Sequence, residues 1–513
     1  MGLSRRDVLG GTAAFSLTPF LGRTPRAAEL DVAIIGGGVA GAYAAWRLAG
    51  TSARVRLFEC SGRIGGRLRS IAFPQAPHLI GEAGGMRFLE AQRHVWKLVN
   101  HLKLEKRSYP IELPQDRLAL RGVNIALGER DKKLFPYNMP SSEQDPKSDI
   151  FMRGLARAVP DAATMNPVKW RAQRLGYRFQ GRALKDWSTW AMMAEIFTAE
   201  EIHFFQDSGG YDDFDLYGSS LGFFDYIFLG EDESKPFSTL VDGYQQLPLT
   251  LARGAAISLN ERLTSITLPE PASGAFRLAF SGSHGKQATI TAKRVVLALP
   301  QRAINLIPDF PARTRFKRLI DSVVAVGACK AFLLYPKPWW HDAGVDAGRS
   351  ITDMPARQFY VYGSESARAA FTTNGYGLLM MYCDATMVEY WKQLARPANS
   401  NTQGFSWLGG ATQLAHEIDR EAALVFNCKT PAPLAAAFQD WTIDPFGGAW
   451  HYWDRGADGI ADGDAMLKPL SDCELYVCGE AWSQDQGWAE GALERSETML
   501  QKHFGLRAPD WLK

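Results

Sequence analysis

A glycine-rich stretch near the start of the chain constrains the fold more than any other part of the sequence. The apolar run 32–35 predicts a buried strand, and a helical pattern follows the turn after it. That turn fits G-x-G-x-x-G with Gly36, Gly38 and Gly41. The first glycine makes the tight turn, the second lets the backbone approach a pyrophosphate, and the third lets the helix pack on the strand, with the helix N-terminus facing the phosphate charge. The stretch therefore predicts a dinucleotide-binding α/β unit.

A second strand and a second glycine-rich loop follow. The run 54–59 predicts a strand that ends in Glu59, about twenty residues past the glycines, where a carboxylate can accept hydrogen bonds from a ribose. The loop 62–67 contains further glycines and ends in Arg67. Backbone amides and arginines neutralise phosphates. A nicotinamide dinucleotide does not generally need such a second loop, whereas the larger flavin dinucleotide can use one.

With these motifs in this order, the sequence resembles the FAD-dependent amine oxidase family, which includes monoamine oxidases, polyamine oxidases and L-amino-acid oxidases. Similar blocks recur over most of residues 30–505. The resemblance implies an α/β fold: a Rossmann-like FAD-binding domain built from discontinuous segments, a mixed-sheet substrate domain and a helical insert. The expected segments are 30–72, 238–325 and 452–513 for the FAD-binding domain, 73–120 and 326–451 for the substrate domain, and 121–237 for the helical domain.

The resemblance also implies which residues hold FAD. Monoamine oxidases link the flavin covalently through a cysteine after a Gly-Gly pair, but Ala449 follows the pair here and cannot form that bond. We therefore expect noncovalent FAD. In relatives, the backbone at the position of Leu263 meets the adenine. The implied cofactor-binding residues are Gly36, Gly38, Gly41, Glu59, Arg67, Gly85, Met86, Arg87, Leu263, Gly479, Glu480, Gly487, Trp488 and Ala489.

Four residues are expected to act on the substrate. L-amino-acid oxidases carry Met-Arg after two glycines, and that arginine, here Arg87, grips the substrate carboxylate, which a guanidinium matches bidentately. Tyr360 matches a tyrosine that donates its hydroxyl to the same carboxylate, and Lys330 matches a lysine that holds a water near flavin N5. Trp488 is expected to wall the pocket, with Trp450 as a weaker candidate. The alternatives are a structural ion pair or phosphate contact for Arg87 and an exposed strand end for Lys330.

These residues imply FAD-dependent oxidative deamination of L-amino acids. Hydride passes from Cα to flavin N5, dioxygen reoxidises the flavin to give hydrogen peroxide, and water hydrolyses the imine to a 2-oxo acid and ammonia. Three alternatives stay open: an amine or polyamine oxidase, an L-amino-acid 2-monooxygenase, and a flavoprotein dehydrogenase that does not use oxygen. Nearby Trp and Tyr favour bulky or aromatic substrate side chains, although the sequence does not fix the preferred amino acid.

Residues 1–28 resemble a twin-arginine export signal, with Arg5 and Arg6 before a mildly apolar stretch and a cleavage-like region at 26–28. We therefore expect an exported protein, periplasmic or secreted. No later run is long and apolar enough for a transmembrane helix, so no stable membrane insertion is expected. The net charge of +2 without a long basic run argues against a nucleic-acid partner.

The remaining reactive residues form no second site in the sequence. The six cysteines contain no C-x-x-C and the nine histidines show no metal-type spacing, so we expect mostly free buried thiols and no metal. Residues 218–222 fit G-x-S-x-G, but their flanks indicate neither a preceding strand nor a following helix, which argues against a nucleophilic serine. The oligomeric state stays open, a homodimer included.

Overall fold

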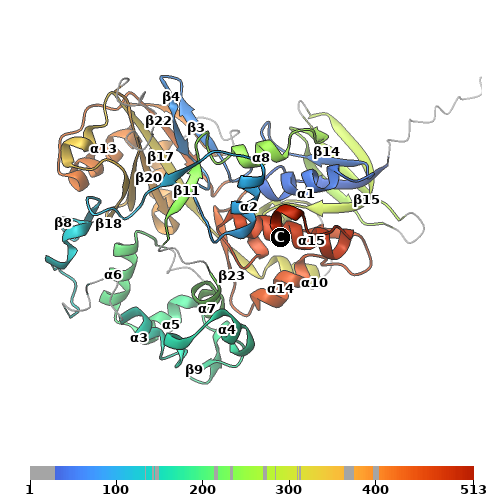
Figure 1. The fold of residues 1–513 in the computed structure, drawn as a ribbon, viewed down its shortest axis with the longest axis horizontal. Helices are drawn as coiled ribbons and strands as arrows, with labels where there is room; N and C mark the ends of the chain where they lie inside the picture. Colours follow the sequence, from blue (N-terminus) through green and yellow to red (C-terminus); the bar gives the residue numbers. More distant parts are fainter. Residues whose placement is uncertain are drawn as a thin grey trace, which may run out of the picture.

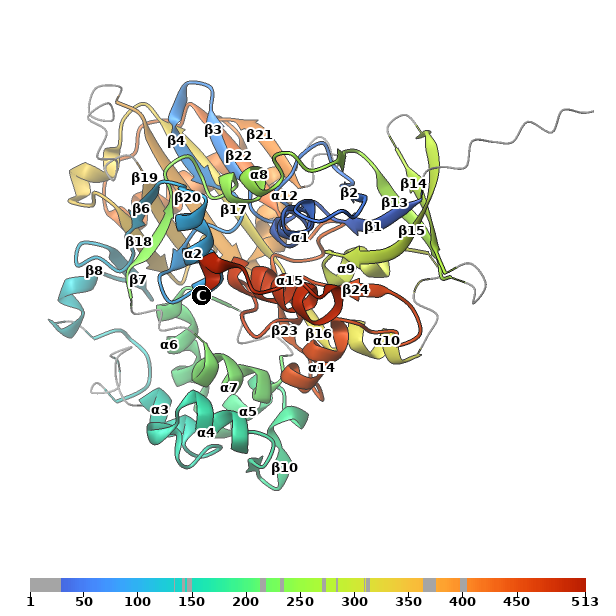
Figure 2. The same cartoon turned by 45° about the vertical axis from the view of Figure 1, so that its right-hand side comes forward.

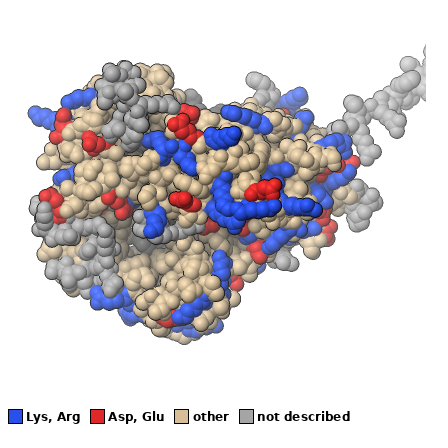
Figure 3. Space-filling view, in the orientation of Figure 1, with Lys and Arg blue, Asp and Glu red and all other residues tan. Residues whose placement is uncertain are grey.

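The computed structural model describes residues 29–513 except 133, 141–143, 145–149, 213–217, 231–234, 270–273, 283–284, 309, 311–313, 363–374 and 397–403. The leader 1–28, with its twin-arginine pattern, lies outside the described residues. The chain forms two bodies built around sheets and a lobe of helices that lies below them in Figures 1 and 2. Basic and acidic side chains are interspersed on the face drawn in Figure 3.

The first body is a seven-stranded sheet that draws on distant segments of the chain. Its strand order is β12-β2-β1-β15-β14-β13, and β24 also pairs with β15. Pairing is parallel between β1 and its neighbours β2 and β15, whose apolar residues are buried on both faces. Helix α1 packs against α15 and α8. The elements are β1 (Leu30–Ile35), α1 (Val39–Ala49), β2 (Val55–Phe58), α8 (Gln246–Leu251), β12 (Ile257–Ser258), β13 (Arg262–Thr267), β14 (Phe276–Ser281), β15 (Gln287–Leu297), β24 (Leu475–Val477) and α15 (Ala489–Phe504).

The second body is an eight-stranded mixed sheet with the order β21-β22-β17-β20-β19-β18-β7-β8. Only the β18–β7 pair is parallel among the described ladders of this sheet. Helices α12 (Val388–Ala395) and α13 (Gln413–Phe426) contribute to the apolar core on one of its faces. The strands are β7 (Arg117–Leu120), β8 (Val123–Ala126), β17 (Ala328–Tyr335), β18 (Gly348–Thr352), β19 (Gln358–Tyr362), β20 (Gly377–Asp384), β21 (Phe405–Gly409) and β22 (Ala435–Asp440).

The register of this sheet decides which polar side chains share its other face. Lys330 pairs with Tyr382, and Tyr382 pairs with Gln358. Two residues after Gln358 on β19, Tyr360 pairs with Arg349 of β18. Residues directly opposite each other, and residues two apart on one strand, project to the same side of a sheet. These five side chains therefore lie on one face, opposite the core formed with α12 and α13.

The helical lobe contains five α-helices in its described residues: α3 (Ile150–Leu155), α4 (Pro167–Gln173), α5 (Thr189–Ile196), α6 (Ala199–Gly209) and α7 (Ser220–Leu229). A capping box of Thr198 and Glu201 starts α6, and Gly210 ends it in the left-handed conformation, with φ 75°. The expectation that no helix follows the G-x-S-x-G segment is wrong, because α7 begins within it. Ser220 is nevertheless fully buried, which agrees with the absence of a nucleophilic role.

The remaining helices and strands are β3 (Ser70–Phe73), β4 (Ala76–Glu82), β5 (Phe88–Leu89), α2 (Arg93–His101), β6 (Lys106–Tyr109), β9 (Arg178–Phe179), β10 (Arg182–Ala183), β11 (Phe237–Leu240), α9 (Gln301–Asn305), α10 (Thr314–Ile320), β16 (Val323–Val326), β23 (Trp450–Trp453) and α14 (Gly459–Met466). Among the described residues, no helix combines the length and apolar character that crossing a membrane requires.

Candidate active site

A cavity of about 800 Å³ lies where the two sheets and the helical lobe meet. Most of the residues singled out in the sequence line its wall, although they come from segments spread over the chain. Gly41 and Tyr360 do not line it. The sequence-predicted residues on the wall are Gly36, Gly38, Glu59, Arg67, Gly85, Met86, Arg87, Leu263, Lys330, Trp450, Gly479, Glu480, Gly487, Trp488 and Ala489.

Glycines form an open cradle at one end of this cavity. A Cβ on Gly38 would meet only the Gly66 Cα, at 3.9 Å, and one on Gly479 would meet nothing within 4 Å. Gly41 serves packing instead, since a Cβ there would lie 1.9 Å from the Gly36 carbonyl oxygen. The open glycines face the cavity beside the N-terminus of α1, so the residues present fit a dinucleotide with its phosphates at that helix end.

The acid that follows β2 is held in place by hydrogen bonds from Gly37 and Ser61. Glu59 Oε2 accepts a hydrogen bond from Gly37 N at 2.7 Å, and Oε1 accepts from Ser61 N at 2.9 Å and Ser61 Oγ at 2.7 Å. The carboxylate is 6% exposed and lies on the cavity wall. Glu59 thus lies next to the glycine turn, and its ribose-binding role stays a prediction.

A buried ion pair joins the second glycine loop to the C-terminal segment. Arg67 Nη1 lies 2.7 Å from Glu480 Oε2 and also donates to the Ala449 carbonyl oxygen at 2.9 Å. Glu480 Oε1 accepts from the backbone nitrogens of His451 at 2.9 Å and Gly487 at 3.0 Å. Burial raises the pKa of Glu480, but the charges of Arg67 and His451 outweigh it and hold that pKa at about 2. Arg67 thus has an anionic partner within the protein.

Among the residues that the structure describes, Arg87 has no such partner. Its side chain is 7% exposed, its guanidinium lies 4.4 Å from the centre of the Phe237 ring, and Nη1 donates to the Tyr360 hydroxyl at 3.2 Å. Nε is buried without a hydrogen-bond partner, and none of the ion pairs among the described residues includes this arginine. A buried cation without a counter-ion is unfavourable. The cavity beside Arg87 is therefore suited to an anionic ligand.

Lys330 is buried rather than exposed at a strand end. Its Nζ donates to the carbonyl oxygens of Glu82 at 3.0 Å and Gly84 at 2.6 Å, and it lies 5.1 Å from the centre of the Tyr382 ring. Burial, and to a smaller degree the charge of Arg87, lowers the pKa of Lys330 to about 7. A neutral amine with a free lone pair is thus accessible near neutral pH.

The Lys330→Met variant should change how stability depends on pH. The lysine pKa falls from 10.5 in the unfolded chain to about 7 in the fold, so between these values the unfolded state binds more protons and the free energy of unfolding rises with pH. At about 1.4 kcal/mol per unit, this rise is at most about 5 kcal/mol. Calorimetry of the holoprotein should show that the Tm of the variant minus that of the wild type decreases from pH 7 to pH 10.

Two comparisons isolate the effect of Lys330. Burial raises the pKa of Glu82 from 4.5 to about 7, so this neighbour changes stability below pH 7 rather than above it. The exposed Lys337, paired with Asp342, offers a matched Lys→Met control that should show no such trend. Parallel Tm curves for Lys330→Met and wild type would contradict the prediction.

Two of the other predicted substrate residues lie close to Arg87: Tyr360 by a hydrogen bond, and Trp488 through the Phe237 ring. Trp488 stacks on Phe237 with ring centres 6.1 Å apart and planes 8° apart. Trp450 lies on the wall beside Gly487. The Tyr360 hydroxyl accepts a hydrogen bond from Arg87 Nη1 and donates its proton to Gln358 Oε1 at 2.9 Å. Its single proton is therefore directed away from the cavity, which differs from the expected donation to a substrate carboxylate.

Sequence analysis missed several wall residues. Arg349 lines the cavity and its Nη2 lies 2.7 Å from Glu112 Oε1, and Tyr382 lines it beside Lys330. Strand alternation could have placed them on one face, but nothing in the sequence indicates that this face meets a cavity. The helical lobe supplies an aromatic part of the wall: Phe151, Phe205, Tyr211, Phe223 and Tyr226.

Comparison with known proteins bears on the family and the fold of this chain. The family model of flavin-containing amine oxidoreductases matches residues 39–498. Achacin from Lissachatina fulica is 25% identical, with 93% of each chain covered, and L-amino acid oxidase Bs29 from Bothriechis schlegelii is 22% identical over 91% of this chain and 88% of its own. Two solved structures are similar, each covering 93% of this chain and 99% of the other. They are a putrescine oxidase redesigned in its cofactor binding, with a TM-score of 0.69 at 16% identity, and cyclohexylamine oxidase from Brevibacterium oxydans, with 0.65 at 19%. The expected α/β fold is thereby confirmed.

Proposed function

Because this chain belongs to the flavin-containing amine oxidoreductases, we propose that it is an L-amino-acid oxidase that releases a 2-oxo acid, ammonia and hydrogen peroxide. The observation that carries the proposal is the buried Arg87, which lines the cavity without a carboxylate partner among the described residues. An amine without a carboxylate would leave this cation unneutralised, whereas an amino acid supplies the missing anion.

FAD is the cofactor, and it is held noncovalently because Ala449 offers no side chain for a bond to the flavin. When bound, it supplies the two-electron acceptor for the hydrogen at Cα. The protein holds it with the glycine cradle at the N-terminus of α1, with Glu59 for the ribose, and with the segment that begins at Gly479. Trp488 walls the cavity between this segment and Arg87.

Arg87 and Lys330 have separate tasks in the proposed reaction. Arg87 orients the substrate by its carboxylate and so fixes the position of Cα. In its neutral form, Lys330 can give its two protons to its nearer partners, the carbonyl oxygens of Glu82 and Gly84, while Met86 Sδ lies farther away at 3.5 Å. Its lone pair is then left to accept a hydrogen bond from a water, which supports the proposed role of holding water for the reaction.

An oxygen-consumption panel with the holoenzyme tests this function. The twenty L-amino acids, their D-forms and simple amines are compared, and hydrogen peroxide and 2-oxo acid are measured for each substrate that is oxidised. We expect turnover of L-amino acids only, with one peroxide and one 2-oxo acid per oxygen consumed.

Other outcomes would identify the alternatives. Turnover of amines alone would indicate an amine or polyamine oxidase. An amide product with loss of carbon dioxide would indicate a monooxygenase. Anaerobic reduction by an amino acid without reoxidation in air would indicate a dehydrogenase.

We further propose that the protein is exported, on the basis of Arg5 and Arg6 in the leader. Active flavoprotein found only in the cytoplasmic fraction would contradict export.

A further inference from the structure

A line of hydrogen bonds runs from the helical lobe to Arg87. Gln358 Nε2 donates to the Gly210 carbonyl oxygen at 2.7 Å, the Tyr360 hydroxyl donates to Gln358 Oε1 at 2.9 Å, and Arg87 Nη1 donates to the Tyr360 hydroxyl oxygen at 3.2 Å. All three side chains are buried. Because Gly210 is where α6 ends, the line joins the end of a lobe helix to the cation on the cavity wall.

The direction of every bond in this line is fixed. A carbonyl oxygen can only accept, so Gly210 orients the Gln358 amide with its nitrogen towards the lobe and its oxygen towards Tyr360. That oxygen also only accepts, so Tyr360 must give its proton to Gln358. Arg87 can only donate, and it donates to the oxygen that Tyr360 has left. Only one arrangement of the protons therefore makes all three of these hydrogen bonds.

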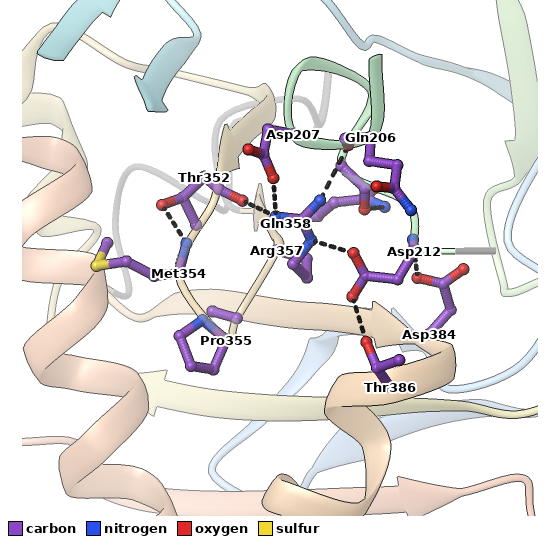
Figure 4. A network of polar contacts seen from close by, with 12 residues as sticks. Gln206, Asp207, Asp212, Thr352, Met354, Pro355, Arg357, Gln358, Asp384 and Thr386 are labelled. Carbon is purple, nitrogen blue, oxygen red and sulfur yellow. Dashed lines mark hydrogen bonds and ion pairs between the residues drawn. The ribbon is translucent and has the colours of Figure 1, made fainter. Parts of the chain in front are cut away.

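The residue before Gln358 ties the same loop to α6. Arg357 has φ 55°, in the left-handed region, and its side chain is buried (Figure 4). Its guanidinium bonds to backbone and carboxylate groups on both sides of Gly210 and on the sheet. These partners are the carbonyl oxygens of Gln206, at 2.9 Å, and Thr352, at 3.1 Å, and the carboxylates of Asp207 and Asp212, each at 3.1 Å. The end of α6 is thus held against β19 where the line of hydrogen bonds begins.

We propose that Gln358 is a positioning residue that orients Arg87 for the substrate carboxylate and makes that orientation depend on the position of α6. This rests on the proposed function of Arg87. With Nη1 bonded to Tyr360, the guanidinium keeps its side-on edge, Nε and Nη2, for a bidentate carboxylate. Nε is the buried atom that has no partner among the described residues.

The Gln358→Glu variant tests the proposal because the new side chain is isosteric and titratable. A protonated carboxyl can still donate to Gly210 and accept from Tyr360, whereas an ionised one can only accept, which leaves the Gly210 carbonyl oxygen unpaired. We expect near-wild-type KM at low pH and a KM about tenfold above that of the wild type at high pH, with kcat little changed. The substrate is the L-amino acid with the highest kcat/KM in the panel.

Several charged groups lie around this position and are the same in both proteins. They are Asp207 and Asp212 of the lobe segment, Asp384 of β20, Arg357 of the β18–β19 turn, and Arg87, Lys330 and Arg349 at the cavity. The wild type measured over the same pH range accounts for their contribution.

Gln358→Leu and Tyr360→Phe, singly and together, give a second test without a new charge. If Gln358 and Tyr360 act through the same line of hydrogen bonds, the double variant should raise KM no more than the single variant with the larger effect.

Thr198→Ala is the matched control, since it removes the cap at the other end of α6 and leaves Gly210 unchanged. It should lower Tm while KM stays within about twofold of the wild type. A pH-independent KM in Gln358→Glu, a loss of kcat alone, or an equal rise of KM in Thr198→Ala would overturn the inference. A wild type inactive on every L-amino acid would instead overturn the proposed function and this inference with it.

Discussion

The Arg87→Ala variant is expected to lose about 10³-fold in kcat/KM for L-amino acids, because removing one partner of a buried charge pair costs about 3–5 kcal/mol. The guanidinium is 7% exposed and has no carboxylate partner among the described residues, so a substrate carboxylate would be its counter-ion. The loss should appear in KM and in the rate of anaerobic flavin reduction, since the carboxylate also fixes the position of Cα. Flavin absorbance should confirm that FAD remains bound.

Two further variants make this prediction specific. Arg87→Lys keeps the charge but loses the planar fork, so its kcat/KM should fall between those of the wild type and the alanine variant. Arg349→Ala removes another cavity-wall arginine, but one that already has the Glu112 carboxylate at 2.7 Å. Its effect should be smaller. Full amino-acid oxidase activity in Arg87→Ala would refute the carboxylate-binding role.

The Gly38→Val variant should fold but retain less than about a tenth of the wild-type FAD, because its side chain would occupy the place where the backbone approaches the pyrophosphate. The protein itself leaves room for this side chain, since φ is −72° and a Cβ would meet only the Gly66 Cα at 3.9 Å. Flavin content per chain after desalting measures the loss, and circular dichroism checks the fold.

Gly50→Ala is the control for this variant. Gly50 lies at the C-terminal end of the same helix, α1, and a Cβ there would meet nothing within 4 Å. This variant should bind FAD like the wild type. A Gly38→Val protein that is purified with stoichiometric FAD would show that the cradle does not hold the phosphates.

Features that depend on neighbouring residues could be predicted from the sequence. The strand, turn and helix around Gly36 and Gly41 follow from local demands: one glycine has φ 106°, and the other leaves no space for a Cβ. Lys330 was expected at the site from the resemblance, and a lysine in an apolar strand is unfavourable to bury without a task. In the structure, burial lowers the pKa of Lys330 to about 7, which reflects the cost of burying its charge.

Features that depend on register and on contacts between distant segments could not be predicted. Arg349 lies on the cavity wall because of the register in which β18 pairs with β19, where it is opposite Tyr360. No local sequence pattern specifies that register. The role expected for Tyr360 assumed a hydroxyl facing the substrate. The structure instead directs that hydroxyl to Gln358, whose orientation is set by a carbonyl group at the end of α6.

By itself, the sequence determined the dinucleotide-binding unit and its second glycine-rich loop, because backbone conformation is a property of single residues and their neighbours. The choice of Arg87 as the arginine for a carboxylate came from the resemblance to a known family. Tertiary structure alone decided how that arginine is oriented. Arg87 and Tyr360 are 273 positions apart and meet only in the folded structure. Hydrogen bonds have direction and short range, so their pattern exists only once those segments are in place.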